Sequence, residues 1–356
     1  MPAEYEVVVV GGGPGGLTAA LYTTRLGHET ALINREGGRY TAVEHVHNLI
    51  GVSEETTGRE ITELAFAQLE EYGADRYDDT VADIDVVGGE GENGGRRFRV
   101  GGRDVEALAD RVVLATGFKD APPSFPELTR YTGHGLHYCL HCDAYSLIDE
   151  PVFVFGHTES AAHAAMVLLN FTADVELLLN GAEPEWNEEV GKQLGAHPLE
   201  VREEEAVAVH PRDSEGPRPE IGAIEFADGT VREYTGGFAM YGSTYNNELA
   251  VSLGCELAED GAVEVDDHGR TSVEGVYAVG DVTHGHNQTP IAMGDGAKAG
   301  IALHHELRTF PLSPDAIGSD GGETVDVEVP GLPDGIRETA REVNESDEHA
   351  GMTPGE

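Results

Sequence analysis

The sequence predicts an α/β protein in which two parallel sheets are each flanked by helices. Two observations lead to this expectation. Residues 6–16 combine a valine-rich strand, a glycine-rich turn and the start of a helix, and residues 151–161 repeat that order. Each segment is typical of the first unit of a dinucleotide-binding, Rossmann-like domain with three layers. A cysteine pair, Cys139 and Cys142, lies between them, which indicates electron transfer between a bound redox cofactor and a disulfide.

Periodicity and composition place the remaining elements. Alternating residues around a Gly-rich stretch predict an antiparallel hairpin over 86–104. The Pro-rich stretch 118–126 predicts a linker, and the Gly-, Pro- and acid-rich residues 311–356 predict an acidic tail that is partly disordered. The expected strands are 4–10, 30–34, 111–117, 152–155, 175–179, 238–242 and 276–281, and the expected helices are 14–26, 60–72, 160–170 and 291–307.

The chain is strongly acidic, with 66 acidic and 22 basic residues and a formal net charge of -44. Such a charge repels phosphates, so we expect no nucleic-acid partner. The carboxylates are spread along the chain, and the only lysines are Lys119, Lys192 and Lys298. This pattern is typical of a halophile with molar salt in its cytoplasm, where a Debye length of about 3 Å screens like charges. An acidic protein from ordinary salt is the alternative.

Neither a membrane span nor a signal peptide is expected. No apolar run is long enough to cross a bilayer. The first apolar run, Val7–Val10, is short, lacks a basic flank and leads directly into the glycine turn, so it predicts a strand. We therefore expect a cytoplasmic protein with no membrane partner.

Three cysteines are too few for a framework of structural disulfides. Cys255 is predicted to be a small buried apolar residue. Cys139 and Cys142 could bind zinc together with His137 and His141. Structural zinc usually has a second ligand pair at a distance, and the chain has no second Cys-x-x-Cys. We therefore predict no metal site.

The first glycine turn has the context that a dinucleotide site needs, because it follows a four-valine strand and opens a helix. Gly11 permits the tight turn, Gly13 lets a pyrophosphate approach, and Gly16 allows close packing of helix and strand. The helix start offers N–H groups to the phosphates. No acidic residue is evident at the end of the second strand, so Asn34 or Glu36 is the candidate for the ribose. A tight turn without a ligand is the alternative.

Further motifs occur in the order of one known family. They are Gly37-Gly38-Arg39, Val46-His47-Asn48-Leu49-Ile50-Gly51, Ala115-Thr116-Gly117, the Cys-x-x-Cys-Asp at 139–143, Val279-Gly280-Asp281-Val282 and Asn287-Gln288. With these motifs the chain resembles the low-molecular-weight thioredoxin reductases, two-domain flavoproteins, over residues 5–308. The Cys-x-x-Cys-Asp is specific by itself, and the others are specific as a set.

The resemblance implies an FAD-binding domain that is discontinuous in sequence, formed by residues 1–117 and 245–310. Residues 118–244 would form an NADPH-domain-like domain that carries the cysteine pair. The chain would cross between the domains near 117–119 and 241–244. The resemblance also implies a homodimer, and a domain rotation that presents the dithiol alternately to flavin and to substrate.

The resemblance further implies which residues hold FAD. Residues 34–39 would follow its adenosine and pyrophosphate, and Asn48 would approach the isoalloxazine ring. Asp281 would bind the ribityl chain, and Gln288 would lie near the flavin ring. The implied FAD-binding positions are Gly11, Gly13, Pro14, Gly16, Asn34, Arg35, Gly38, Arg39, Asn48, Val81, Thr116, Gly117, Asp281 and Gln288.

For the dithiol, the resemblance implies that Cys142 faces the flavin and that Cys139 attacks the substrate disulfide. Asp143 matches the family's general acid, which protonates a leaving thiolate. His141 stands between the cysteines, where the family has an apolar or small residue, and His137 is close in sequence. Each histidine could stabilise a thiolate, relay a proton or face solvent without a role.

The second glycine turn departs from the family pattern. The expected Gly-x-Gly-x-x-Ala is here Gly156–Ala161, in which Thr158 adds a side chain and Glu159 a negative charge near the phosphate position. The basic cluster that pairs with a 2′-phosphate is missing, since no Arg or Lys stands between Leu179 and Lys192. No acidic residue marks a site for NADH either. We therefore expect FAD as cofactor and inefficient use of NADPH.

These observations predict a thioredoxin-reductase-like flavoprotein disulfide oxidoreductase that passes electrons between FAD and a dithiol through Cys139 and Cys142. The expected partner is a thioredoxin-like protein or a small dithiol or disulfide, and ferredoxin is a candidate electron donor. Three alternatives stay open. They are an ordinary NADPH-dependent thioredoxin-disulfide reductase, an FAD-dependent dithiol oxidase that uses oxygen, and a flavin-binding redox sensor.

Overall fold

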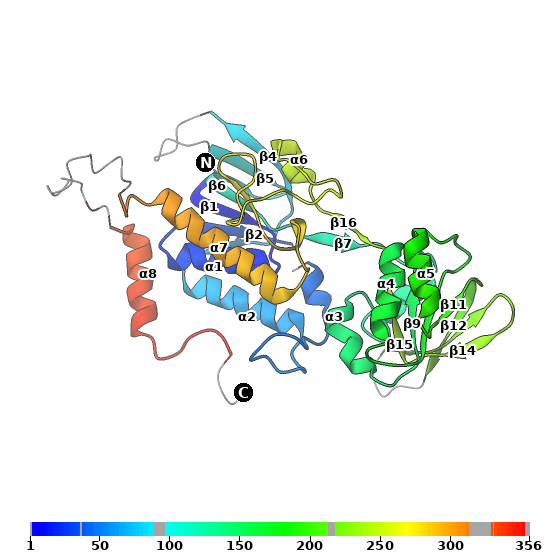
Figure 1. Cartoon of the computed structure of the whole chain (residues 1–356). Coiled ribbons are helices and arrows are strands. Elements are labelled where there is room, and N and C mark those ends of the chain that lie inside the picture. The colour runs from blue at the N-terminus through cyan, green and yellow to red at the C-terminus, as the bar shows by residue number, and fades with distance from the viewer. Residues whose placement is uncertain are drawn as a thin grey trace. The chain divides into compact units, whose positions relative to one another are not determined.

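The computed structural model describes residues 2–35, 38–88, 97–212, 218–312, 329 and 331–352. The chain divides into two compact units (Figure 1). Unit 1 comprises Met1–His45, Glu55–Phe118 and Tyr245–Glu356, and unit 2 comprises Val46–Glu54 and Lys119–Thr244. Each unit contains a parallel sheet with helices packed on it, which confirms the predicted α/β fold class.

The chain passes between the units through two short strands, β7 (Phe118–Asp120) and β16 (Ser243–Tyr245), which pair as a two-stranded sheet. The sequence had placed these crossings near 117–119 and 241–244. Val46–Glu54 groups with unit 2, whereas the sequence had assigned it to the first domain.

Unit 1 is organised around a seven-stranded sheet. Its parallel part runs β3-β2-β1-β6, and β17 also pairs with β6 in parallel. An antiparallel hairpin, β5 and β4, continues the sheet from β6. The strands are β1 (Ala3–Val10), β2 (Thr30–Ile33), β3 (Asp75–Tyr77), β4 (Val81–Val87), β5 (Arg97–Gly102), β6 (Glu106–Leu114) and β17 (Val276–Ala278).

Three helices bury one face of this sheet: α1 (Pro14–Arg25), α2 (Gly58–Glu71) and α7 (Thr289–Leu307). Helices α1 and α7 lie side by side in Figure 1. They approach closely because glycines line the contact, and a Cβ on Gly296 would overlap the carbonyl oxygen of Gly15. This packing fixes the start of α1 at the carboxyl edge of the sheet.

Unit 2 contains a five-stranded parallel sheet in the order β11-β10-β9-β15-β8. Helices α4 (Glu159–Leu168) and α5 (Glu188–Ala196) pack on one face of it, and a three-stranded antiparallel sheet, β12-β13-β14, covers the other. The strands are β8 (Leu136–His137), β9 (Val152–Phe155), β10 (Val175–Leu178), β11 (Glu200–Arg202), β12 (Ala206–Arg212), β13 (Glu220–Phe226), β14 (Val231–Glu233) and β15 (Gly236–Ala239).

Every strand and helix expected from periodicity is present; β9 has the expected bounds, and the ends of the others are shifted. Most of the Gly-rich turn of the expected hairpin lies outside the described residues. Between β10 and β15 the sequence indicated strand-like stretches without bounds, and these are β11 to β14. The sequence did not foresee α5 or several short elements. The short elements are β3, β7, β8, β16, η1 (Arg39–Ala42), η2 (Pro126–Tyr131), α3 (Leu140–Asp143), η3 (Ala144–Leu147), α6 (Glu248–Leu253) and η4 (Gly280–Val282).

Part of the expected tail is folded against unit 1 and contains a helix, α8 (Asp334–Glu345), which the composition did not predict. Leu332 packs against the turn that follows α1. His349 Nδ1 lies 2.7 Å from Glu71 Oε1, and the Ala350 N–H donates to the other carboxylate oxygen at 2.7 Å. The hydrogen bonds from His349 and Ala350 lower the pKa of Glu71, so this end of α2 stabilises the docked segment.

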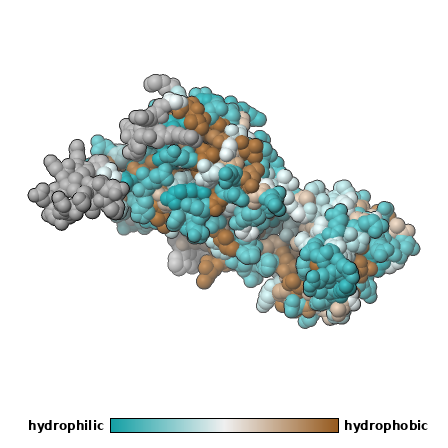
Figure 2. Space-filling model, turned by 45° about the horizontal axis from the view of Figure 1, so that its top comes forward, coloured by the Kyte–Doolittle hydropathy of each residue, from teal (hydrophilic) through white to brown (hydrophobic). Residues whose placement is uncertain are grey.

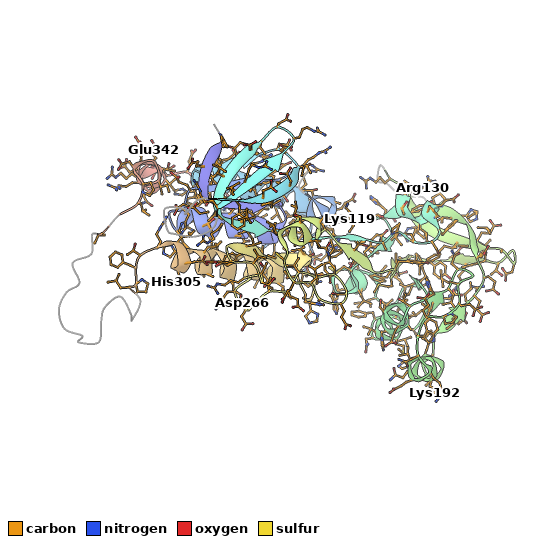
Figure 3. The ribbon with its side chains drawn as sticks, turned by 90° about the horizontal axis from the view of Figure 1, so that it is seen from above. Lys119, Arg130, Lys192, Asp266, His305 and Glu342 are labelled. Atoms are coloured by element: carbon orange, nitrogen blue, oxygen red, sulfur yellow. A yellow bond between two sulfur atoms is a disulfide. The ribbon has the colours of Figure 1, made fainter. Side chains whose placement is uncertain are left out.

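Hydrophilic residues cover much of the face drawn in Figure 2, with several apolar patches between them. Lys192 projects from α5, where its Nζ lies 2.6 Å from a carboxylate oxygen of Glu188 (Figure 3). Across the part of the chain that the structure describes, no helix has the length and apolar character to cross a membrane.

A buried polar network ties β1 to the end of α7. The side chain of His28 is fully buried, with Nδ1 3.2 Å from Glu6 Oε1 and Nε2 3.2 Å from His304 Nδ1. Arg308 donates to both carboxylate oxygens of Glu6. Burial acts to raise the pKa of Glu6, but the hydrogen bonds from His28 and Arg308 outweigh it and lower the pKa to about 2.

We expect Glu6 to make the stability of unit 1 acid-sensitive. Its pKa is lower in the folded chain than the usual 4.5, so its contribution is complete above 4.5 and is lost as the pH falls toward 2. The loss is on the order of 3 kcal/mol at most. Urea unfolding at constant KCl over the acidic range, with Glu6→Gln compared with the wild type, measures it.

Glu4→Gln is the matched control, because Glu4 is exposed and pairs with Arg97 instead. Glu6→Gln should lower stability at neutral pH and flatten its pH dependence, whereas Glu4→Gln should do neither. Parallel pH curves for Glu6→Gln and the wild type would contradict the role of the network.

Candidate redox-active site

The glycine turn of unit 1 lies between β1 and α1, at the carboxyl edge of the sheet. Gly11 has a φ of +110°, and a Cβ there would overlap the carbonyl oxygen of Ala115. A Cβ on Gly16 would overlap the carbonyl oxygen of Gly11. Both positions therefore require glycine, because any side chain would separate the start of α1 from the ends of β1 and β6.

The start of α1 is open. Gly13 is its N-cap residue, and no side chain caps the helix. A Cβ built on Gly13 would meet no atom within 4 Å. The first N–H groups of a helix need acceptors and carry partial positive charge. An uncapped helix start beside open space is suited to bind the pyrophosphate of a dinucleotide.

Asn34 supports this turn from the end of β2. Its Oδ1 accepts a hydrogen bond from the Gly12 N–H at 2.8 Å, and the residue is buried. Asn34 thus stands where dinucleotide-binding folds often carry an acidic residue for the ribose. Arg35 follows it in an exposed bend. Glu36, the other candidate for the ribose, and Gly37 lie outside the described residues.

Thr116 and Gly117 form a turn after β6, and Asn246 holds it. Thr116 Oγ1 donates to the Asn246 carbonyl oxygen at 2.6 Å, and Asn246 Nδ2 donates to the Thr116 carbonyl oxygen at 2.8 Å. The Asn246 N–H donates to the carbonyl oxygen of Gly117 at 2.9 Å, and Gly117 has a φ of +64°. Sequence reasoning missed Asn246, whose position just after the second crossing was the available signal.

Asp281 and Gln288 belong to the same edge, because β17 runs parallel to β6 and ends at Ala278. Gly280, with a φ of +67°, packs against Gly15 at the start of α1. Gln288 is the N-cap residue of α7, and its side chain does not cap the helix. The edge therefore combines two helix starts without side-chain caps with the Asp281 residue.

Three further positions of unit 1 were predicted from the sequence. The Arg39 guanidinium lies over the Phe118 ring, 4.7 Å from its centroid. Gly38 has a φ of +64°, with open space where a Cβ would lie. Val81 begins β4 and pairs with Gly102 beside the start of β6, so it lies at the opposite edge of the sheet and is not brought to the glycine turn. The glycine turn, Asn34, Thr116, Gly117 and Asp281 are thus the group that the sheet brings to one edge.

Cys139 and Cys142 form a disulfide in unit 2, with their Cα atoms 5.3 Å apart. The single turn α3 brings them together, since the N–H groups of Cys142 and Asp143 both donate to the Cys139 carbonyl oxygen at 3.2 Å. Asn48 Nδ2 donates toward Cys142 Sγ at 3.8 Å. The sulfur of Cys142 therefore meets the segment that was expected to approach the flavin ring.

His137 and Asp143 face each other beside this disulfide. His137 Nδ1 lies 3.4 Å from Asp143 Oδ2, and the two side chains are 18% and 20% exposed. His137 is in register with Phe238 of β15, and their ring centroids are 5.7 Å apart. His141, which sequence reasoning had grouped with His137, is exposed on α3. The structure thus separates the environments of the two histidines.

The third cysteine is remote from this chemistry. Cys255 is buried in the core of unit 1, as predicted, and burial raises the pKa of its thiol. Among the described residues, no group of three or more His, Cys, Asp or Glu side chains is arranged to hold a metal ion.

The second glycine turn, between β9 and α4, differs from the first at its N-cap. A Cβ on Gly156 would lie 2.8 Å from the Met240 carbonyl oxygen, so this approach is also tight. Thr158 is the N-cap residue of α4, and its side chain accepts a hydrogen bond from the Ala161 N–H at 3.4 Å. Where Gly13 leaves the start of α1 open, Thr158 caps the start of α4.

A segment that follows β10, Glu183–Asn187, lies against the second turn and is called the closing segment here. The Glu185 N–H donates to the His157 carbonyl oxygen at 2.7 Å, and an isolated β-bridge joins Glu185 to the next residue of the turn. Glu185 Oε1 also lies 3.6 Å from His157 Nε2. Asn187 Nδ2 donates to Glu159 Oε2 at 3.0 Å. Backbone and side-chain contacts therefore hold the closing segment at the turn.

Asn180, which follows β10, also forms hydrogen bonds within unit 2. Asn180 has a φ of +53°, and its Oδ1 accepts a hydrogen bond from the Ala206 N–H at 2.8 Å. Its Nδ2 donates to Ser124 Oγ at 2.8 Å, and Ser124 Oγ lies 2.8 Å from the Tyr241 hydroxyl. Asn34 supports the first turn directly, whereas Asn180 binds the surrounding loops instead.

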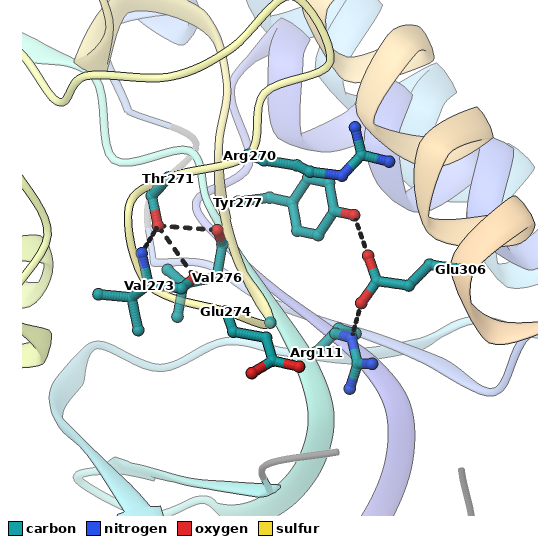
Figure 4. Close-up of a pocket in the computed structure, with 9 residues that line it drawn as sticks. Arg111, Arg270, Thr271, Val273, Glu274, Val276, Tyr277 and Glu306 are labelled. Carbon is teal, nitrogen blue, oxygen red and sulfur yellow. Dashed lines mark hydrogen bonds and ion pairs between the residues drawn. The ribbon is translucent and has the colours of Figure 1, made fainter. Parts of the chain in front are cut away.

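A pocket of about 300 Å³ lies elsewhere in unit 1 (Figure 4). Glu306 accepts hydrogen bonds there from the Tyr277 hydroxyl and from Nε of Arg111. Burial and the bond to Glu306 raise the pKa of Tyr277. No residue predicted from the sequence to bind FAD or to form the dithiol lines this pocket, in which Arg111 and Glu306 pair with each other.

Comparison with known proteins agrees with this geometry. Residues 5–296 match the family described as pyridine nucleotide-disulphide oxidoreductase. A thioredoxin reductase of Peptoclostridium litorale is 32% identical over 318 residues, covering 85% of this chain and 96% of the relative. The thioredoxin reductase of Streptococcus pyogenes MGAS5005 superposes with a TM-score of 0.77 at 25% identity, covering 87% of this chain and 100% of the other. The crystal structure of HlmI superposes with a TM-score of 0.76 at 28% identity, covering 85% of this chain and 92% of the other.

Two glycine substitutions should separate chain packing from cofactor binding. Gly13→Ala places its methyl group in open space, so we expect nearly unchanged stability but less bound flavin. In Gly11→Ala the alanine would have to adopt a positive φ, and its methyl group would overlap the carbonyl oxygen of Ala115. We therefore expect the free energy of unfolding to fall by roughly 1–3 kcal/mol. Urea unfolding and the ratio of flavin to protein absorbance measure the two effects. Full flavin content in Gly13→Ala would exclude the open helix start as the pyrophosphate site.

Proposed function

The chain belongs to the pyridine nucleotide-disulphide oxidoreductase family, and we propose that it is a flavoenzyme that passes electrons between FAD and an external dithiol or disulfide through Cys139 and Cys142. The observation that carries this proposal is the disulfide itself, formed across one helical turn with Asn48 against Cys142. Disulfides of this kind exchange with thiols through a mixed disulfide.

Unit 1 supplies the groups that would hold FAD. The uncapped start of α1 would bind the pyrophosphate, and the open space at Gly13 would admit it. Asp281 would accept hydrogen bonds from the ribityl hydroxyls, with the Thr116–Gly117 turn nearby. When bound, FAD supplies a carrier of two electrons. The chain supplies its position and the dithiol with which it exchanges electrons.

The cysteines then carry out two exchange steps. The Cys139 thiolate attacks a substrate disulfide, a bond forms between Cys139 and one substrate sulfur, and the other sulfur leaves as a thiolate that takes a proton from Asp143. The Cys142 thiolate attacks Cys139 Sγ, which restores the enzyme disulfide and releases the second substrate thiolate. Two electrons pass from enzyme to substrate, and the reverse steps oxidise an external dithiol.

A thioredoxin-like protein is our favoured partner. Tyr145, three residues after Cys142, is 76% exposed, and Ile50, two residues after Asn48, is 100% exposed. Exposed large apolar side chains close in sequence to a reactive centre are typical of contacts with a macromolecule. A small dithiol or disulfide is the alternative substrate. The acidic surface supports work in a cytoplasm of molar salt, and the family resemblance supports a homodimer.

We propose further that NADPH is not an efficient electron donor. The Thr158 side chain caps α4, and Glu159 adds a negative charge in its first turn. The Glu185 N–H is bonded to the His157 carbonyl oxygen within the turn. A pyrophosphate would have to displace the cap and approach two carboxylates, whereas the start of α1 presents neither obstacle.

The charges around the closing segment support the same conclusion. No Lys or Arg lies between β10 and Lys192, and Lys192 pairs with Glu188. Arg202 on β11 donates to Glu176 at 2.6 Å. A 2′-phosphate would therefore meet the carboxylates of the closing segment without a guanidinium to bind it.

Two sources of electrons are compatible with a closed second turn. A reduced carrier protein such as ferredoxin could reduce the flavin, or a dithiol substrate could reduce it through Cys139 and Cys142. In the second case oxygen would reoxidise the flavin, and the enzyme would be a dithiol oxidase. The capped start of α4 favours this second candidate over an NADPH-dependent reductase, because an oxidase needs no nicotinamide site.

We expect the flavin to remain oxidised when the protein is mixed without oxygen with micromolar NADPH at high KCl. Excess dithiothreitol should bleach it, because the dithiol route does not use the second turn. Stopped-flow absorbance measures both reactions. Cys142→Ser is the matched control and should abolish bleaching by dithiothreitol while flavin content is kept. Rapid bleaching by NADPH would refute inefficient NADPH use.

The reaction with oxygen distinguishes a dithiol oxidase from a reductase that depends on a carrier protein. For a dithiol oxidase we expect one hydrogen peroxide for each dithiol oxidised in air, with many turnovers per flavin. For a carrier-dependent reductase we expect little peroxide, and rapid flavin bleaching by reduced ferredoxin. Peroxide and thiol assays on the same sample decide between them, and a protein that shows neither activity would favour a redox sensor.

A further inference from the structure

We propose that His137 is a positioning residue that exchanges a proton with Asp143 while the Cys139–Cys142 dithiol reacts, an inference that rests on the proposed disulfide chemistry. The proposal separates His137 from His141, which the sequence left equivalent. The observation that motivates it is the 3.4 Å contact between His137 Nδ1 and Asp143 Oδ2.

The scaffold holds His137 in a defined place. It lies on β8, which pairs with β15 in parallel, so its backbone position is set by the sheet. Its ring packs on the side chain of Phe238. Asp143 ends the helical turn that joins the two cysteines. The contact therefore links the end of β8 to the helical turn that carries the cysteines, and both side chains are about four-fifths buried.

Among the described residues, His137 and Asp143 are each other's ionic partner. Strand β15 carries no titratable side chain. His141 is exposed on α3, on the solvent side of the same turn. The remaining titratable or charged groups nearby in the described chain are Tyr138 directly after β8, Tyr145 on η3, Glu127, Arg130 and Tyr131 on η2, and His47 and Glu54, which lie 4.0 Å from each other.

The proton path follows from the exchange steps. When the mixed disulfide forms, the leaving substrate thiolate takes the proton of Asp143, which becomes a carboxylate. A proton then passes from His137 Nδ1 to Asp143 Oδ2, and the imidazole takes another from water. The two electrons move only through sulfur. His137 thus returns Asp143 to its protonated form after the first substrate thiolate has left and before the second one leaves. It does so without contacting the substrate.

This path makes a selective prediction about leaving groups. An aliphatic thiolate needs a proton as it leaves, whereas an aromatic nitrothiolate has a low pKa and leaves unprotonated. His137→Gln keeps a hydrogen-bond donor toward Asp143 but cannot supply a proton. We expect it to slow exchange with oxidised glutathione roughly 10-fold and to change its pH profile. Exchange with 5,5′-dithiobis(2-nitrobenzoate) should keep the wild-type rate.

The experiment uses the holoenzyme reduced with dithiothreitol and freed of excess reductant, in single turnover with each disulfide. Asp143→Asn should show the same selective loss, and His137→Gln/Asp143→Asn should lose no more than Asp143→Asn alone. His163→Gln, a substitution at an exposed residue of α4, controls for changing a histidine in unit 2. A purely structural role of His137 would slow both disulfides equally.

The outcomes distinguish this inference from the proposed function. If wild-type enzyme reacts with neither disulfide, the dithiol chemistry itself is wrong. If the wild type reacts with both and His137→Gln matches it at every pH, or if His141→Gln alone gives the selective loss, only the role of His137 is overturned. Neither reaction requires NADPH, ferredoxin or oxygen, so the choice of electron donor does not affect the result.

Discussion

The N–H groups at the start of a helix need hydrogen-bond acceptors, and this constraint decides what each unit can bind. Unit 1 leaves the start of α1 without a side-chain cap and places open space at Gly13. Unit 2 repeats the strand, turn and helix, but the Thr158 side chain caps its helix, and the Glu185 N–H is hydrogen-bonded to the turn. One local geometry thus leaves a helix start open in the first unit and capped by a side chain in the second. The proposed binding of flavin and the proposed inefficient use of NADPH both follow from this difference.

The dithiol depends on a second local geometry. One helical turn sets the two cysteines at disulfide distance, and its hydrogen bonds to the Cys139 carbonyl oxygen keep that turn formed. Strand β8, which ends two residues before Cys139, supplies His137 and pairs with β15. The dithiol motif is therefore anchored to the sheet through the chain itself and through the contact between His137 and Asp143.

The sequence predicted those features that local sterics determine. Gly11 and Gly16 admit no side chain, so each leaves a recognisable pattern. The sequence also indicated that Thr158 places a side chain at the second turn, although not that this side chain caps α4. Features made by distant segments left no such pattern. The hydrogen bonds between Asn246 and Thr116 join residues that are 130 positions apart. The position of the closing segment likewise depends on tertiary packing. Helix α8 was missed because its composition is that of a disordered tail, although docking on unit 1 supplies contacts that composition does not reveal.

The docked segment that contains α8 is remote from the dinucleotide edge. It attaches to the turn after α1 and to the end of α2, whereas that edge lies at the start of α1, about 18 Å away along a helix of 12 residues. The family match covers residues 5–296, so the segment lies outside it. It is therefore an appendage whose residues can vary without displacing the start of α1.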